Sequence, residues 1–107
     1  MTNFYDFNLD DALGSELVDL IFENENMRIE RIVSMGQVTP DDYIYNQKED
    51  EFVTVIKGNA VIYFVDEGNS VMLKEGDSLM INSGRRHQVT YTSKPCIWLC
   101  IFNKIGE

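Results

Sequence analysis

The second half of the chain alternates between short apolar runs and glycine-centred turns. The turns lie at 57–59, 67–69 and 74–77, where Gly or a neighbouring Asn supplies the positive φ that a tight hairpin requires. The runs between them are rich in β-branched and aromatic residues and recur at a spacing typical of a β-sandwich or barrel. They predict strands at 51–56, 60–66, 70–74, 78–81, 87–92 and 96–102.

The first half of the chain has a weaker pattern. Residues 1–15 are polar and acidic, and we expect an N-terminal arm with at most one short helical turn. The apolar run 16–22 suits two helical turns as well as a buried strand, and we favour the strand. A turn at 23–26 and an Ile- and Val-rich strand at 27–34 follow, so we expect 16–22 and 27–34 to pair as a hairpin. The pattern thus predicts an arm at 1–15 and a single all-β domain at 16–107.

Length and charge narrow the classes of function. A chain of 107 residues suits one domain that buries a core without disulfide or metal support. Nine Lys and Arg residues against 18 Asp and Glu residues give a net charge of -9, which repels phosphate backbones and anionic lipids. No apolar stretch approaches the roughly 20 residues of a membrane span, and no secretory signal is evident. We therefore expect a cytoplasmic protein that binds neither nucleic acid nor membranes.

Cysteine and histidine are scarce. Cys96 and Cys100 are too few for a disulfide framework, and their spacing along one strand keeps the two sulfur atoms too far apart to bond. We expect both to be reduced packing residues. His87 is the only histidine and there is no Cys-x-x-Cys pair. Any metal site must therefore depend on oxygen ligands.

Two stretches resemble the paired motifs of the cupin superfamily. The first motif runs Gly, five residues, His-x-His, three or four residues, Glu, six residues, Gly, and Glu51 and Gly58 have its final spacing. The second runs Gly, five residues, Pro-x-Gly, two residues, His, three residues, Asn. Gly76, Gly84 and His87 fall in register with it. The resemblance covers about half of the chain and implies a cupin-type double-stranded β-helix, a jelly-roll barrel with a hollow interior.

Both motifs also depart from the family pattern. If three residues separate His-x-His from Glu51, Tyr45 and Gln47 occupy the two histidine positions, and Asn82 replaces the proline of the second motif. A closer resemblance is to small stand-alone cupins in which an aromatic-Tyr-Asp-Gln-like stretch precedes an acidic run, as at 44–51 here. That group implies an architecture and a pocket more strongly than a reaction.

The matched motif positions imply a metal site. Strand alternation places Glu51 on a face with Val53 and Val55, where a buried carboxylate requires a metal ion, an arginine or a proton. Similarity to cupins implies that Glu51 and His87 face the barrel interior, with Gln47 as the third ligand. We expect these three to bind one divalent transition metal (Mn, Fe, Ni or Zn) weakly, because they offer one nitrogen ligand. The alternatives are a solvated acid, a packed histidine and an amide that bonds a ligand or water.

Three further residues are candidates for lining a ligand pocket. Tyr45 lies two residues before the predicted amide ligand, on the same strand face. Alternation also places Tyr91 on the face of His87. Arg31 could pair with Glu51 or with a ligand carboxylate. The alternative for Arg31 is a side chain that extends along the barrel to reach solvent.

Three functions remain open at this point. Similarity to catalytic cupins implies a metal-assisted enzyme on a small polar molecule, such as an oxygenase, isomerase or decarboxylase. Loss of both histidines of the first motif favours a metal-free small-ligand binding or sensing module. The third is an interaction protein. We also expect a homodimer, because the apolar run 17–22 has more apolar surface than one strand of a small barrel needs.

Overall fold

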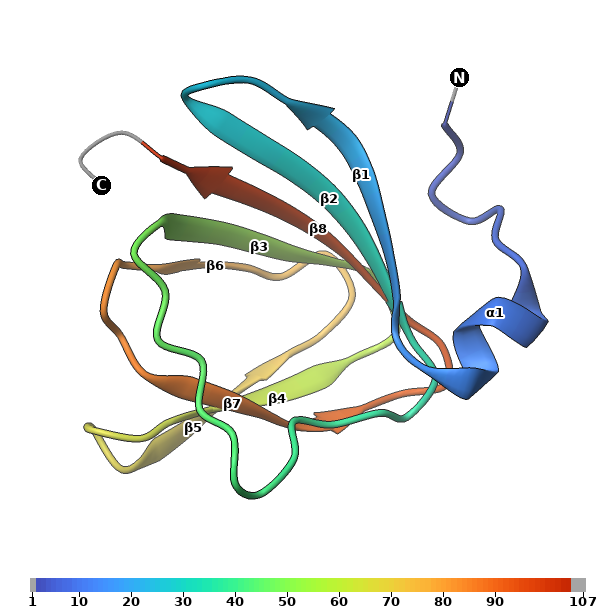
Figure 1. The fold of residues 1–107 in the computed structure, drawn as a ribbon. Helices are drawn as coiled ribbons and strands as arrows, with labels where there is room; N and C mark the ends of the chain where they lie inside the picture. Colours follow the sequence, from blue (N-terminus) through green and yellow to red (C-terminus); the bar gives the residue numbers. More distant parts are fainter. Residues whose placement is uncertain (1, 105–107) are drawn as a thin grey trace.

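A computed structural model describes residues 2–104, which form two facing β-sheets and one short helix (Figure 1). The all-β prediction is confirmed, and every predicted strand is present with ends shifted by two residues or fewer. The elements are α1 (Leu9–Gly14), β1 (Leu17–Glu23), β2 (Met27–Ser34), β3 (Asp50–Lys57), β4 (Ala60–Phe64), β5 (Asn69–Leu73), β6 (Ser78–Ile81), β7 (His87–Thr92) and β8 (Cys96–Asn103).

The strand order explains the hollow between the sheets. The larger sheet runs β1-β2-β8-β3-β6 and the smaller one β5-β4-β7, with antiparallel pairing throughout. From β3 onward the chain changes sheet at every connection except the β4–β5 hairpin. The long connection between β2 and β3, both in the larger sheet, passes beside β7 of the smaller sheet, where Tyr45 pairs with His87, and then returns to the larger sheet (Figure 1).

Alternating side chains from both sheets build the core. In β3 the buried positions recur with period two, so that Glu51, Val53 and Val55 share the inner face. Cys96 and Cys100 are free thiols in the same interior, which confirms them as reduced packing residues. The buried core consists of Val53, Val55, Ala60, Ile62, Phe64, Leu73, Ile81, Cys96, Trp98, Cys100 and Phe102.

A second, smaller cluster lies on the outer face of the larger sheet. There α1 packs its one buried residue, Ala12, with Val33 and Ile97. Arg31 lies on this outer face, where its Nη1 donates to the carbonyl oxygens of Asp6 (2.6 Å) and Asn3 (3.1 Å). Its Nε and Nη2 donate to one carboxylate oxygen of Asp19. Arg31 therefore holds the N-terminal arm against the sheet.

Replacing Arg31 with methionine is expected to release this arm and to lower the free energy of unfolding by about 2 kcal/mol, because several charge-assisted hydrogen bonds are lost together. Urea unfolding and chymotrypsin cleavage at Tyr5 or Phe7 measure the two effects. Arg86→Met is the matched control, since Arg86 forms only an exposed ion pair with Asp66. Equal cleavage of the arm in wild type and Arg31→Met would show that Arg31 does not hold it.

The strand β1 forms one edge of the larger sheet. Its side chains Val18, Leu20 and Phe22 are each about half exposed, at 51%, 58% and 49%. The expected homodimer and the domain boundary at residue 15 stay predictions.

Within residues 2–104 no helix has the length and apolar character needed to cross a membrane.

Candidate functional site

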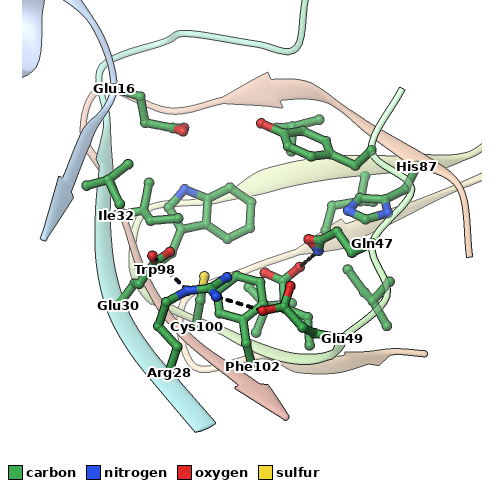
Figure 2. Close-up of a pocket in the computed structure, with 17 residues that line it drawn as sticks. Glu16, Arg28, Glu30, Ile32, Gln47, Glu49, His87, Trp98, Cys100 and Phe102 are labelled. Atoms are coloured by element: carbon green, nitrogen blue, oxygen red, sulfur yellow. Dashed lines mark hydrogen bonds and ion pairs between the residues drawn. The ribbon is translucent and has the colours of Figure 1, made fainter. Parts of the chain in front are cut away.

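A cavity of about 370 Å³ lies between the two sheets (Figure 2). Its walls are apolar, with Trp98 and Phe102 from β8, Val53 from β3 and Ile62 from β4. Polar side chains enter from β2, β3, β7, β8 and the long β2–β3 connection. Together with Glu16, which precedes β1, they form four groups, centred on Glu51, His87, Glu16 and Arg28.

Glu51 is the most deeply buried carboxyl group of the cavity, with 8% of its surface exposed. Burial raises its pKa to about 7, opposed by hydrogen bonds from the Cys100 thiol and the Gln47 amide. The Gln47 Nε2 donates to Glu51 Oε1 over 2.9 Å. Near neutral pH this carboxyl group is therefore poised between its protonated and ionised forms.

His87 begins β7 and is 4% exposed. Its Nδ1 lies 2.9 Å from the carbonyl oxygen of Arg85, which can only accept, so Nδ1 carries the proton. The other nitrogen, Nε2, is then an acceptor, and no residue among 2–104 donates to it. The ring stacks on Tyr45 with centroids 5.3 Å apart. Burial lowers the pKa of the imidazole, which keeps it neutral at pH 7.

A hydrogen-bonded chain runs along another wall of the cavity. The Trp98 Nε1 donates to Ser34 Oγ (3.2 Å), and Ser34 Oγ donates to Glu16 Oε2 (2.7 Å). Burial raises the pKa of Glu16 despite the hydrogen bond from Ser34. Glu16 was not among the predicted site residues, because in the sequence it only precedes an apolar strand.

Arg28 lies toward one end of the cavity, between two carboxylates (Figure 2). Its Nη1 donates to Glu49 Oε2 over 2.6 Å and its Nε to Glu30 Oε2 over 3.1 Å. Its guanidinium carbon lies 4.1 Å from the centroid of the Phe102 ring. Arg28 and its partners were not predicted as site residues, because the alternation in β2 defines two faces without indicating which one is internal.

Arg31 and Tyr91 do not line the cavity, contrary to the sequence prediction. Even-numbered residues of β2 face inward, and the arm covers the outer face that carries Arg31. In β7, Thr90 is an extra residue in the pairing with β4, and this bulge reverses the alternation after Val89. Tyr91 is consequently 47% exposed, while Thr92 turns inward and is buried.

The donor set does not fit the metal that the cupin resemblance implies. Glu51, His87 and Gln47 all line the cavity, but Gln47 directs its amide nitrogen at Glu51, and burial favours the protonated form of that carboxyl group. Burial also raises the pKa of Tyr45, so its phenol keeps its proton. No cluster of three or more His, Cys, Asp or Glu side chains suited to a metal ion occurs within the described part of the chain. Of the donors that transition metals prefer, ionised carboxylates and neutral imidazoles, His87 is the one ready to ligate.

Comparison with solved structures gives cupin-like folds. A protein of Ralstonia eutropha JMP134, whose description proposes a mannose-6-phosphate isomerase, is 31% identical with a TM-score of 0.79, over 83% of this chain and 84% of that one. A cupin superfamily protein of Desulfitobacterium hafniense DCB-2 is 18% identical (TM-score 0.72; 83% and 77% covered). The DMSP lyase DddQ of Ruegeria pomeroyi DSS-3 is 15% identical (TM-score 0.72; 91% and 51% covered).

No curated protein sequence matches the chain. A family model described as "Cupin domain" matches residues 32–102, which is well over half of the sequence and includes β3 to β7 and nearly all of β8. The two facing antiparallel sheets and the similar solved structures agree with that match. The chain therefore belongs to the cupin domain family, and its fold is the cupin jelly roll.

Proposed function

We propose that this chain binds a small organic molecule in the cavity between its sheets, through hydrogen bonds to His87 and Glu51 and without a resident metal ion. The observation that carries the proposal is the state of His87. Its ring is almost fully buried, its Nδ1 is fixed by the Arg85 carbonyl group, and its Nε2 has no donor among residues 2–104. A bound molecule that donates to Nε2 would complete the site.

Physical chemistry favours such an occupant. Among residues 2–104 no buried side-chain nitrogen or oxygen lacks a partner, so Nε2, which has none, still faces the space of the cavity and is accessible to a ligand donor. Apolar walls with a few convergent polar groups are also the usual composition of a small-molecule pocket, and 370 Å³ is within the usual size range. Glu51, whose pKa burial raises to about 7, lies in the same cavity.

The similar structures support binding more than any one reaction. The descriptions include a proposed sugar-phosphate isomerase and a lyase, so the fold alone selects no chemistry. The proposal departs from a metal-assisted enzyme because His87 offers the one ready metal donor of the predicted set.

The sole tryptophan, Trp98, lines the cavity and reports on it directly. Protein dialysed against EDTA is titrated with three probes of one shape, benzamidine, benzamide and benzoate, while the Trp98 indole N–H resonance is followed by NMR. We expect at least one probe to shift this resonance. The substitution His87→Phe, which removes the acceptor but keeps an aromatic ring beside Tyr45, should weaken that binding about tenfold.

Two outcomes would overturn the proposal. One is the absence of any shift of the indole resonance with all three probes at millimolar concentration. The other is a shift that occurs only after Mn²⁺ or Zn²⁺ is restored, because the site would then depend on a metal ion. Calorimetric titration with Mn²⁺ or Zn²⁺ in 0.15 M salt should give the same metal affinity for wild type and His87→Phe.

A further inference from the structure

Resting on the proposed binding function, we infer that the cavity selects a small organic cation with N–H donors on an apolar body, such as an amine, amidine or guanidine, and rejects anions. This inference names the class of ligand for the same cavity. It rests on the charges that line the cavity, on the acceptors it presents and on a cation of the chain that already lies within it.

The charges on the cavity wall are mostly negative. Four carboxyl groups line it, those of Glu16, Glu30, Glu49 and Glu51. Among the lining residues Arg28 is the one permanent cation, and its guanidinium is already shared between Glu30 and Glu49. Two carboxylates share this one cation, so their group is net negative, and a cationic ligand is attracted while an anion is repelled in a partly desolvated space.

Two of the hydrogen-bonding groups in the cavity, the His87 ring and the Glu51 carboxyl group, present acceptor atoms to a ligand. His87 Nε2 has no donor among residues 2–104, and the Glu51 carboxyl group accepts from Gln47 at Oε1 and from the Cys100 thiol. The Cys100 S–H and one N–H of Gln47 are directed at Glu51 and are not available to a ligand. A ligand that carries two or more N–H groups complements this arrangement, whereas a carboxylate or phosphate carries acceptors only.

Arg28 shows how a cation is accommodated here. Its planar guanidinium lies over the face of Phe102, with its centre 4.1 Å from the ring centroid, and two of its nitrogens donate to carboxylates. The aromatic face, the carboxylates and the enclosed space together form a cation site of the type that recognises organic ammonium and guanidinium groups. Trp98 offers a second aromatic ring in the wall of the same cavity.

A phosphate ester lacks a partner in this cavity. Arg31 lies on the outer face of the sheet, and Arg85 and Arg86 form ion pairs with Glu67 and Asp66. Phosphate recognition normally requires free arginine or lysine donors or a helix N-terminus. The isomerase description of the Ralstonia eutropha protein concerns a sugar phosphate, and we infer a different ligand class for this chain.

The three probes introduced above test this inference by their charge. Benzamidine is a cation with N–H donors, benzamide is a neutral donor of the same shape, and benzoate is an anion. In 0.15 M salt, which screens the surface charge, we expect benzamidine to bind about tenfold more tightly than benzamide, and benzoate or inorganic phosphate to cause no shift of the Trp98 resonance.

A pair of variants distinguishes an effect of the cavity from an effect of the overall negative charge of the protein, and a third tests the resident cation. Glu51→Gln should remove most of the preference for benzamidine over benzamide, whereas Glu75→Gln, at an exposed position, should preserve it. Arg28→Met removes the resident cation and should tighten benzamidine binding several-fold, because it frees Glu30 and Glu49.

The failure of this inference is distinct from failure of the proposed function. Equal affinity for benzamidine and benzamide, or tighter binding of benzoate or phosphate, would overturn the cation preference while leaving a working pocket. Loss of benzoate binding in Arg28→Met would then identify Arg28 as an anion donor. No binding of any probe overturns both proposals.

Discussion

Replacing Glu51 with glutamine is expected to stabilise the protein above pH 7 and to change its stability little near pH 5. In the unfolded chain this carboxyl group loses its proton near its ordinary pKa of 4.5, whereas burial raises the folded pKa to about 7. Between these values the folded state holds more protons, so stability falls as pH rises. Above pH 7 the penalty reaches about 3 kcal/mol, which an amide does not incur.

Glutamine suits this experiment because it keeps the size of the side chain and its acceptor oxygen for Gln47. The measurement is the free energy of urea unfolding of wild type and Glu51→Gln between about pH 5 and pH 8. Other groups near Glu51 titrate or carry charge in both proteins, so the difference isolates Glu51. They are Arg28 and Glu30 on β2, Glu49 in the connection, His87 on β7 and Cys100 on β8.

The control is Glu75→Gln, whose exposed carboxyl group should leave the pH dependence unchanged. A difference between wild type and Glu51→Gln that stays constant with pH would show that the carboxyl group is solvated when the protein is folded. If Glu51→Gln is more stable and also loses its preference for benzamidine, Glu51 is a group retained for binding at a cost to stability.

The strands and turns of this fold were predictable because they depend on local signals. Gly-centred turns require positive φ, and glycine residues 58, 68 and 76 adopt it. Alternation along β3 correctly placed Glu51 on the inner face with Val53. The ambiguous run 16–22 became a strand because β2 pairs with it along most of its length, which a local pattern cannot specify.

The site residues were less predictable because their placement depends on distant packing. Arg31 shares a face with Ile29 and Val33 as expected, but the N-terminal arm covers that face, so Arg28 enters the cavity instead. Tyr91 turned outward because of the single extra residue Thr90 in β7. Neither the docking of an arm nor a bulge has a reliable signature in one sequence.

The metal site stays a prediction, and the direction of one hydrogen bond bears on it. The predicted ligands Glu51, His87 and Gln47 do line one cavity. The Gln47 amide, however, donates its hydrogen to Glu51 and so satisfies the carboxyl group in the way that a metal ion would have done. The spacing of a motif predicts the backbone position of a residue, whereas contacts with neighbouring side chains determine which of its atoms faces the cavity.

Gly58→Ala is expected to lower the free energy of unfolding by about 3 kcal/mol. Gly58 ends the first cupin-like motif and has a φ of 84°, which disfavours a side chain. A Cβ there would overlap Ser93 Oγ and the carbonyl oxygen of Pro95. Neither atom can move freely, because Ser93 Oγ accepts from the backbone of Asn59 (2.9 Å) and donates to Pro95 (2.8 Å).

Gly76→Ala is a closely matched control. Gly76 has nearly the same φ, 87°, but a Cβ there would meet no atom within 4 Å. Its substitution should therefore report the cost of positive φ alone, about 1 kcal/mol. Equal destabilisation of the two variants in urea unfolding would show that the contact with the β7–β8 connection is unimportant.

The Gly58 contact also bears on the cavity. The contact lies where the end of β3 meets the start of β8. Glu51 lies on β3, and Trp98 and Cys100 lie on β8. The pairing of these strands shifts by one residue at Ile56, next to this contact. An alanine at 58 would force the two strands apart where their register is set, and so disturb the hydrogen bond between Cys100 and Glu51. We therefore expect Gly58→Ala to weaken benzamidine binding as well as stability, whereas Gly76→Ala should reduce stability alone.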